Sequence, residues 1–360
     1  MRLDAFTKRV MRKNKSNQSR LPLTISAQYG LVDQVTFFNK IVASTDLSNY
    51  YLLKKGEFAY NKSYSSDYPW GAIKRLDNYD QGALSSLYIC FTPQDNVVSD
   101  FILQYFESPK WHKGISEIAV EGARNHGLLN VSVQDFFHTY HYVPKDKKEQ
   151  IKISKLLMLF DERIATQNKI IEDLKKLKSA ISENLFKAVK GDVVILSEIC
   201  EIIKGKQVNS EFLSEKGKYY VMNGGTEPSG YYSDYNVEAN TISISEGGNS
   251  CGYVQFNTSP FWSGGHCYTI QKIADNVDHL YLYHYLKSKE DAIMKLRIGS
   301  GLPNIQKKDL AMFKIKLPTV EQQKSISTFL SSLERKAEIE ERIRNSILDE
   351  KRCLLHQMFI

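Results

Sequence analysis

Two long stretches of the chain carry seam positions at alternating steps of four and three residues. The first stretch keeps this spacing without a break, and no Pro or Gly occurs between Lys145 and Lys190. Such spacing is typical of a coiled-coil helix. We therefore predict a long central helix over residues 145–190. Its predicted seam residues are Ile153, Leu157, Phe160, Ile164, Gln167, Ile171, Leu174, Lys178, Ile181 and Leu185.

The second stretch has the same spacing and predicts a C-terminal helix over residues 319–360. Its seam residues are Ile326, Leu330, Leu333, Ala337, Glu340, Arg344, Ile347, Lys351, Leu354 and Met358. Each pattern covers about forty residues, roughly 60 Å of helix at 1.5 Å per residue. A helix of that length with a narrow seam needs a second helix beside it, and the obvious partner is its own repeat. The alternative is that each helix packs only on the domain that precedes it.

Polar residues at seam positions of a coiled coil usually fix the register of the helices and the choice of partner helix, at a cost in stability. The apolar seam residues that we expect to form the helix pair are Ile153, Leu157, Phe160, Ile164, Ile171, Leu174, Ile326, Leu330, Leu333 and Ile347.

The regions before the helices follow a different pattern, with short β-rich runs bounded by Gly, Asn, Ser and Asp. Examples are "YLLKKGEFAYNKSY", "GAIKRL", "SSLYICFTP", "NTISISEGGNSCGYVQF" and "CYTIQKI". Each region is therefore predicted to be a strand-dominated α/β (α+β) fold with several loops. The predicted boundaries are 1–144 for the first β-rich domain, 145–190 for the central helix, 191–318 for the second β-rich domain and 319–360 for the last helix.

The chain contains an internal repeat. At an offset of 174 residues the matching pairs are Gly127/Gly301, Leu128/Leu302, Asn130/Asn304, Val131/Ile305, Asp135/Asp309 and Pro144/Pro318. Within the helices the offset is 173, as in Gln150/Gln323 and Asp161/Glu334. The chain is thus a tandem of two similar units, each a mixed region followed by a long helix.

Composition agrees with two globular units, since 360 residues with 42% hydrophobic and 25% charged residues allow two cores of ordinary size. The first residues lack the apolar segment of a signal peptide, and no apolar run is long enough to span a bilayer. We therefore expect a cytoplasmic protein without a membrane partner. Five scattered cysteines without a Cys-x-x-Cys pair predict neither a disulfide framework nor a metal site.

The positive charge is unevenly distributed. The formal net charge is +7, but residues 1–20 hold seven Lys and Arg against Asp4 alone, a local +6 that leaves +1 for the rest. Such a segment is either a basic arm or first helix that binds phosphate, or a solvated helix face or frayed terminus.

Two segments mix Tyr with Ser, Asn, Gly and Lys: "YNKSYSSDYPWGAIKR" from Tyr60 and "MNGGTEPSGYYSDYN" from Met222. These residue types bind phosphates and base edges and offer stacking surface. They are also ordinary turn and core residues.

Taken together, the repeated Gly-Leu-x-Asn-[Ile/Val]…Asp…Pro stretch and the following helix with Gln-x-x-Ile-x-x-x-Leu resemble the specificity subunit of Type I restriction-modification systems. The most specific stretches are "GSGLPNIQKKDLAMFKIKLPTVEQQKSISTFLSSLE" and "LSEICEIIKGKQ". The first copy departs from the pattern with Leu129 in place of Pro303 and with one extra residue before Glu149.

The resemblance implies two target-recognition domains, each reading one half of a split, asymmetric sequence in double-stranded DNA. It implies that the two helices form an antiparallel coiled coil, acting as a spacer and as the docking surface for two DNA-methylating subunits. Restriction/translocase subunits would join the full complex. No cofactor is expected in this chain, whereas S-adenosylmethionine is expected in the partner methyltransferase subunits.

Other functions fit the sequence less well. A DNA methyltransferase needs a Gly-rich cofactor loop and an Asn/Asp-Pro-Pro-Tyr-type tetrapeptide, and this chain has no Pro-Pro. A nuclease needs converging carboxylates for a metal, and none is singled out. A coiled-coil scaffold that binds no DNA leaves two elaborate β-rich regions unexplained.

We expect DNA contacts beside the Tyr-rich segments and the repeated Gly-Leu, where Arg and Lys near Gly-rich turns can reach phosphates or guanine edges. The competing interpretation is that these charges are paired with carboxylates on the surface. The candidates are Lys62, Tyr64, Lys74, Arg75, Arg124, Asn125, His126, Asn223, Thr226, Tyr231, Tyr232 and Arg297.

Overall fold

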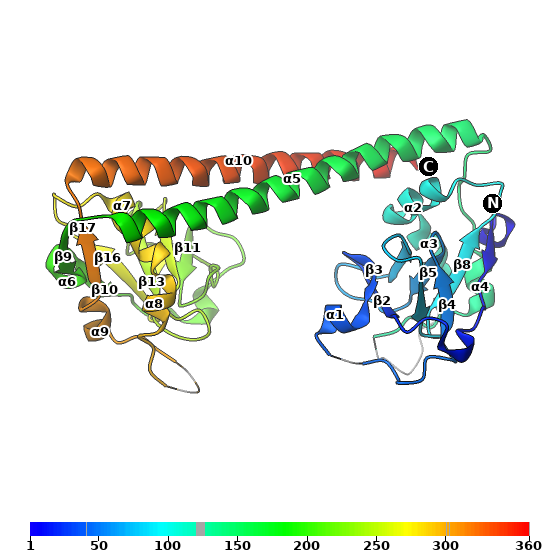
Figure 1. Ribbon diagram of the computed structural model, residues 1–360, viewed down its shortest axis with the longest axis horizontal. Helices are drawn as coiled ribbons and strands as arrows, with labels where there is room; N and C mark the ends of the chain where they lie inside the picture. Colours follow the sequence, from blue (N-terminus) through cyan, green and yellow to red (C-terminus); the bar gives the residue numbers. More distant parts are fainter. Residues whose placement is uncertain (41, 120–126, 300, 302, 360) are drawn as a thin grey trace. The chain divides into compact units, whose positions relative to one another are not determined.

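The computed structural model describes residues 1–40, 42–119, 127–299, 301 and 303–359 (Figure 1). Its contacts form two compact units. The first comprises Met1–Gln167 with Ile343–Ile360, and the second comprises Asn168–Arg342. Each unit therefore contains one β-rich part and one half of each long helix, and we describe each unit separately.

The two long helices are present, as predicted: α5 spans Lys147–Ala188 and α10 spans Val320–Met358. Within each unit their segments run antiparallel. Asp161 of α5 pairs with Lys351 of α10 in the first unit, and Lys178 of α5 lies 2.7 Å from Glu334 of α10 in the second. Every seam position named above is buried or half-buried. Each helix packs both on its partner helix and on a β-rich part.

The β-rich part of the first unit contains two four-stranded sheets, ordered β1-β8-β5-β6 and β3-β2-β7-β4. All neighbours are antiparallel except β2 and β7, which are parallel. The strands are β1 (Thr7–Arg9), β2 (Pro22–Ser26), β3 (Gly30–Asp33), β4 (Tyr51–Lys54), β5 (Phe58–Asn61), β6 (Ala72–Arg75), β7 (Gln81–Leu84) and β8 (Ile89–Pro93).

The second unit also has a four-stranded sheet, together with two smaller sheets. Its four-stranded sheet has the order β10-β16-β13-β14, and β11 pairs antiparallel with β12 and parallel with β15. A further pair, β17-β9, joins the two ends of its β-rich part. The strands are β9 (Asp192–Ile195), β10 (Glu201–Lys204), β11 (Tyr219–Met222), β12 (Tyr231–Tyr232), β13 (Thr241–Ser245), β14 (Val254–Asn257), β15 (Trp262–Ser263), β16 (Cys267–Gln271) and β17 (Lys314–Leu317).

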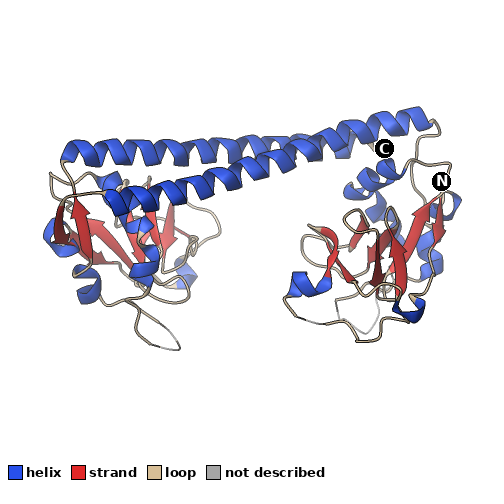
Figure 2. Ribbon diagram, in the orientation of Figure 1, coloured by secondary structure: helices blue, strands red, loops and turns tan. Residues whose placement is uncertain are grey.

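Short helices surround these strands (Figure 2). In the first unit they are η1 (Leu3–Ala5), η2 (Lys15–Asn17), α1 (Gln34–Phe38), α2 (Ser99–Glu107), η3 (Pro109–Trp111), α3 (His112–Ile118) and α4 (Val133–His138). In the second unit they are α6 (Leu196–Ile199), η4 (Ser210–Phe212), α7 (His279–Ser288), α8 (Glu290–Met294) and α9 (Lys307–Ala311).

Aromatic packing joins the end of each long helix to a β-rich part in an equivalent way. Phe359, next to the end of α10, lies 5.5 Å from the rings of Phe101 and Tyr105 on α2. Phe186, near the end of α5, lies 5.7 Å and 5.2 Å from the rings of Tyr281 and Tyr285 on α7. Both phenylalanines are buried, so each helix end completes a hydrophobic core.

Neither proposed form of the basic N-terminal segment is correct. Leu3 and Phe6 are fully buried, and β1 pairs with β8, so the segment is part of the first core and neither a free arm nor a frayed end. Its helical residues form two short 3-10 helices and not a long first helix. Arg12 also uses its charge internally, because its guanidinium lies 2.7 Å from Glu57.

No helix among the described residues combines the length and hydropathy needed to cross a membrane. Within the same residues, no group of three or more His, Cys, Asp or Glu side chains is arranged to hold a metal ion.

Candidate nucleic-acid interface

In the first unit, the β5–β6 connection lies against the repeated Gly-Leu segment. Leu129 N donates a hydrogen bond to the Lys62 carbonyl at 2.9 Å, and Tyr64 N donates to the Gly127 carbonyl at 3.1 Å. The structure therefore brings Lys62 and Tyr64 beside the segment that follows Arg124, Asn125 and His126. Those three candidates lie outside the described residues. Tyr64 is exposed, and Lys62 has no ion pair among the described residues.

Lys74 and Arg75 lie in a different environment. Lys74 Nζ is 2.6 Å from Glu107, and Arg75 lies 2.7 Å from both Asp77 and Asp100. Arg75 pairs with Phe58 at the start of β5, whereas Lys62 follows the other end of that strand. The structure does not bring these two cations into the loop cluster. Their carboxylate pairing matches the competing interpretation and ties β6 to α2.

In the second unit, four candidates lie on β12 and on the β11–β12 connection. Tyr231 and Tyr232 pair with Tyr220 and Tyr219, and the Tyr232 ring meets the Trp262 ring edge-on at 5.0 Å. Asn223 directly follows β11, and Thr226 is exposed in the same connection. The hairpin thus presents aromatic and amide groups next to each other.

Arg297 leads into the second copy of the repeated segment. Ile298 and Gly247 both bridge to Asn304, and Ile305 N donates to the Glu246 carbonyl at 2.8 Å. The acceptors of this bond and of the Leu129 bond lie at matching places, because Lys62 follows β5 and Glu246 follows β13 in the two sheets, although the repeat matches the donor Ile305 with Val131. The same framework position therefore carries opposite charges in the two units.

Glu246 is the centre of a polar cluster that the candidate residues did not include. Its side chain is 8% exposed, and Oε1 accepts from Lys204 Nζ at 2.6 Å and from the Tyr268 hydroxyl at 3.0 Å. Burial and the Glu246 carboxylate both raise the pKa of Tyr268, so this hydroxyl stays a donor. Glu246 Oε2 has no hydrogen-bond partner among the described residues and faces His266 Nδ1 at 3.7 Å.

Glycine pairs make this arrangement possible. A Cβ at Gly224 would lie 3.1 Å from His266 Cβ, and a Cβ at Gly264 would lie 2.5 Å from the side-chain oxygen of Asn223. Asn223 Oδ1 in turn accepts from His266 N at 3.1 Å. The Gly-Gly pairs at residues 224–225, 247–248 and 264–265 are the feature of the sequence that could have indicated this cluster. The exposed His266 joins Asn223 as a group available to DNA.

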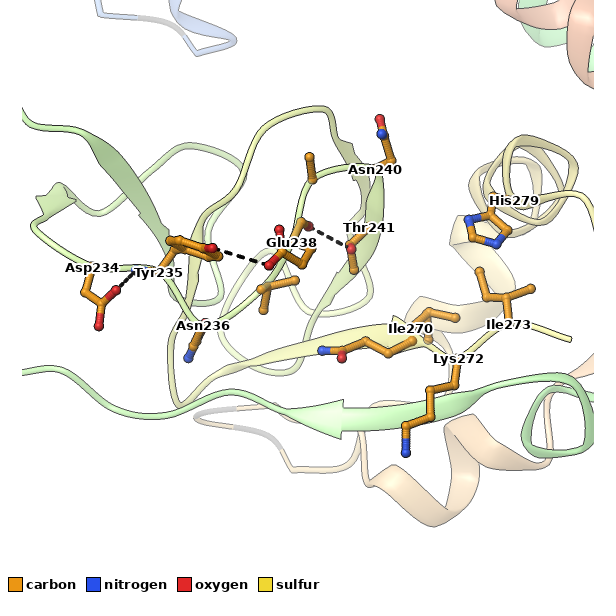
Figure 3. Close-up of a pocket in the computed structure, with 13 residues that line it drawn as sticks. Asp234, Tyr235, Asn236, Glu238, Asn240, Thr241, Ile270, Lys272, Ile273 and His279 are labelled. Carbon is orange, nitrogen blue, oxygen red and sulfur yellow. Dashed lines mark hydrogen bonds between the residues drawn. The ribbon is translucent and has the colours of Figure 1, made fainter.

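An acidic hollow of about 600 Å³ lies elsewhere on the second unit, lined by residues 234–241 and 270–273 with His279 (Figure 3). The Tyr235 hydroxyl donates to Glu238 at 3.3 Å, and Tyr235 N donates to Asp234 at 2.8 Å (Figure 3). The Glu238 charge raises the pKa of Tyr235, which therefore stays protonated. Asp234 and Glu238 line the hollow together with Lys272, whose charge is paired with Glu201 at 3.0 Å, and carboxylates repel phosphates. We therefore leave the hollow out of the candidate interface.

Comparison with known proteins agrees with this architecture. Residues 189–349 match the family model described as the Type I restriction modification DNA specificity domain. A provisionally named type I specificity subunit of Mycoplasma pneumoniae is 34% identical over 145 residues, which is 40% of this chain and 38% of the relative. The specificity subunit of the MjaVIII type I restriction enzyme of Methanocaldococcus jannaschii is 25% identical, over 77% of this chain and 73% of the relative.

The fold has a counterpart among solved structures. The S subunit of a type I restriction-modification system from Mycoplasma genitalium superposes with a TM-score of 0.65 at 19% identity, covering 100% of this chain and 95% of that chain. This likeness shows a shared fold of β-rich domains and long helices. Residues 189–349 therefore carry a type I restriction modification DNA specificity domain, and the matching relatives are named as type I specificity subunits, in agreement with the resemblance seen in the sequence.

Proposed function

We propose that this chain is the sequence-recognition subunit of a type I restriction-modification complex. The β-rich part of each unit, here called a recognition domain, would read one half of a bipartite, asymmetric site in double-stranded DNA. The observation that carries the proposal is that the two units share a strand arrangement but have different side chains in the loops that follow the strands. Lys62 and Glu246 hold equivalent backbone positions with opposite charges, so the two half-sites should differ in sequence.

The paired helices would act as spacer and as docking surface for two DNA-methylating subunits. In the first unit, a groove of about 360 Å³ between α5 and α10 is lined by Leu159, Phe160, Ile343 and Ile347 among others. Leu159 is 61% exposed although it is a large apolar residue. Exposed apolar surface of this kind supports protein docking. S-adenosylmethionine would bind in those partners, and restriction/translocase subunits would complete the complex.

A non-catalytic role is supported by the chemistry of the described side chains. Burial raises the pKa of Cys90 and Cys200 to about 12, so these thiols stay protonated at neutral pH and are poor nucleophiles. The curated relatives that match are themselves named specificity subunits. Those names support a recognition role and give no support to methyl transfer or strand cleavage by this chain.

Selection from a random duplex pool tests the proposal. The chain is assembled with type I methylating subunits, bound duplexes are recovered, and their sequences are determined. We expect two short, different motifs separated by a gap of fixed length and unspecified sequence. A single continuous motif would contradict bipartite recognition, and recovery of unselected DNA would contradict sequence recognition altogether.

A further inference from the structure

Two ion pairs between the long helices are equivalent under the internal repeat. Asp161 of α5 binds Lys351 of α10 in the first unit, and Glu334 of α10 binds Lys178 of α5 in the second. The repeat offset of 173 residues relates Asp161 to Glu334 and Lys178 to Lys351. Both copies therefore pair a carboxylate with a lysine at matching positions.

Each carboxylate also binds the recognition domain of its own unit. Gln104 Nε2 of α2 donates to Asp161 Oδ2 at 2.7 Å, and the Tyr283 hydroxyl of α7 donates to Glu334 Oε1 at 3.2 Å. Both donors are buried, with Gln104 only 1% exposed. Asp161 and Glu334 thus each hold three elements together: both long helices and the domain helix that packs on them. We call these two arrangements the carboxylate joints.

In each unit, a glutamine on the same long helix makes a second attachment to the recognition domain. Gln150 Oε1 accepts from Val98 N at 2.7 Å, and Gln323 Oε1 accepts from Asp278 N at 2.8 Å. Eleven residues separate Gln150 from Asp161 and Gln323 from Glu334, about 16 Å along a helix. Two attachment points at this separation oppose both sliding and rotation of the domain on its helix.

The carboxylate joints place charged and polar groups where burial removes them from water, which costs folding free energy. Lys351 is 12% and Lys178 is 22% exposed at the side chain, so both ion pairs are partly desolvated. Gln104 Oε1 has no hydrogen-bond partner among the described residues. Apolar residues at such places are often at least as stabilising, whereas polar residues at a helix seam define register and partner.

We propose that Asp161 and Glu334, with Lys351 and Lys178, are positioning residues that fix each recognition domain on the helix pair and so hold the DNA site to one gap length. This inference rests on the proposed bipartite recognition. One added base pair shifts a half-site by about 3.4 Å along the DNA axis and rotates it by roughly 35°. A recognition domain held rigidly on the helix pair cannot move to the shifted half-site, whereas a loosely held recognition domain can.

The test uses the full chain, alone and assembled with methylating subunits, on duplexes carrying the motif selected above. The gap is shortened or lengthened by one and two base pairs. For the wild type we expect affinity to fall about tenfold or more at a changed gap, comparable to a lost base-pair contact. For Asp161→Asn combined with Glu334→Gln, affinities at gaps one base pair away should come within about threefold of the best gap.

The control removes equal charge from exposed pairs on the same helices: Glu172→Gln combined with Asp349→Asn, whose carboxylate side chains are 63% and 74% exposed. It should keep the sharp gap preference. A second variant reverses both ion pairs, exchanging Asp161 with Lys351 and Lys178 with Glu334. It should restore the preference, because the Gln104 amide and the Tyr283 hydroxyl can each accept as well as donate.

Sharp gap preference in a folded Asp161→Asn, Glu334→Gln chain overturns the inference. Equal loss of affinity at every gap also overturns it, because a loosened joint redistributes affinity among gaps. Should that double variant unfold, the reversed-pair variant decides: a sharp preference supports the joints and a broad one refutes them. If the wild type selects no bipartite motif, the proposed function fails first and this inference falls with it.

Discussion

Lys62 and Lys74 lie only twelve residues apart in sequence but have different surroundings. Lys62 sits in the loop cluster beside Gly127–Leu129 without an ion pair among the described residues, whereas Lys74 is held by Glu107. An unpaired lysine is available to a phosphate, and a paired one must first break its ion pair. The two lysines therefore differ in that only Lys74 uses its charge in an ion pair within the domain.

The corresponding prediction compares Lys62→Ala with Lys74→Ala. Loss of a phosphate contact at Lys62 should weaken binding to all sequences alike and lower the salt slope by about one. Lys74→Ala should leave DNA affinity unchanged and reduce the free energy of unfolding by on the order of 1 kcal/mol. Fluorescence titrations at several salt concentrations measure the first effect, and denaturant unfolding measures the second. Equal DNA affinities for Lys62→Ala and the wild type would exclude Lys62 from the interface.

His284 is a buried neutral histidine that makes stability depend on pH. Burial lowers its pKa to about 4, and its Nε2 lies 2.9 Å from Ser331 Oγ. The unfolded chain binds a proton below about pH 6.5 while the folded chain resists it, so stability falls as pH drops from 6.5 toward 4. His284 contributes about 3 kcal/mol to that loss at most. His284→Gln should make this loss smaller in denaturant unfolding, whereas exposed His356→Gln should not. Part of the loss should remain, because burial also lowers the pKa of His141 to about 4.

At the scale of elements, neighbouring residues of α10 test the helix pair. Ile347 is 6% exposed at the seam, whereas Leu348 is 37% exposed beside it. Ile347→Asp buries an unpaired charge and should cost several kcal/mol, while Leu348→Asp should cost less than about 1 kcal/mol. Thermal unfolding followed by circular dichroism compares the two. Similar unfolding temperatures would mean that this seam does not pair the helices.

Leu174 and Leu177 give the same comparison on α5 in the second unit, since Leu174 is half-buried and Leu177 is 50% exposed. Leu174→Asp combined with Ile347→Asp should disrupt helix pairing and assembly with methylating subunits before either recognition domain unfolds. Co-purification and hydrogen exchange of the sheets measure the two effects separately. Normal assembly of that double variant would show that the seam is misassigned.

At the scale of the whole molecule, two domains on one chain should read DNA independently. Tyr232 is half-buried against Trp262 in the second unit, within its candidate hairpin. Tyr232→Ala should relax the selected sequence in one half-motif by on the order of 1–3 kcal/mol and leave the other half-motif unchanged. Sequencing of selected duplexes measures both halves in one experiment. Altered preference in both halves would mean that the domains do not read separately.

Local patterns in the sequence determined the helices, the strands and the repeat. A heptad seam and alternating β-rich runs are properties of neighbouring residues, so α5, α10 and strands such as β5, β8 and β16 follow from the sequence alone. The resemblance of the repeated Gly-Leu-x-Asn segment to a known family predicted the type of domain that the family model matches at residues 189–349. The Tyr-rich segment from Tyr60 and the repeated Gly-Leu segment, both singled out in the sequence, are the two segments that meet at Lys62 and Gly127.

Only the tertiary structure decided which polar side chains are used internally. Lys74 meets Glu107, Lys204 meets Glu246, and Asp161 meets Lys351 across 33, 42 and 190 residues of sequence. Composition gave residues 1–20 a net charge without showing that Leu3 and Phe6 belong to the first core. Periodicity records which face of an element is apolar, but ion pairs depend on which elements pack together, and that is set by the folded chain as a whole.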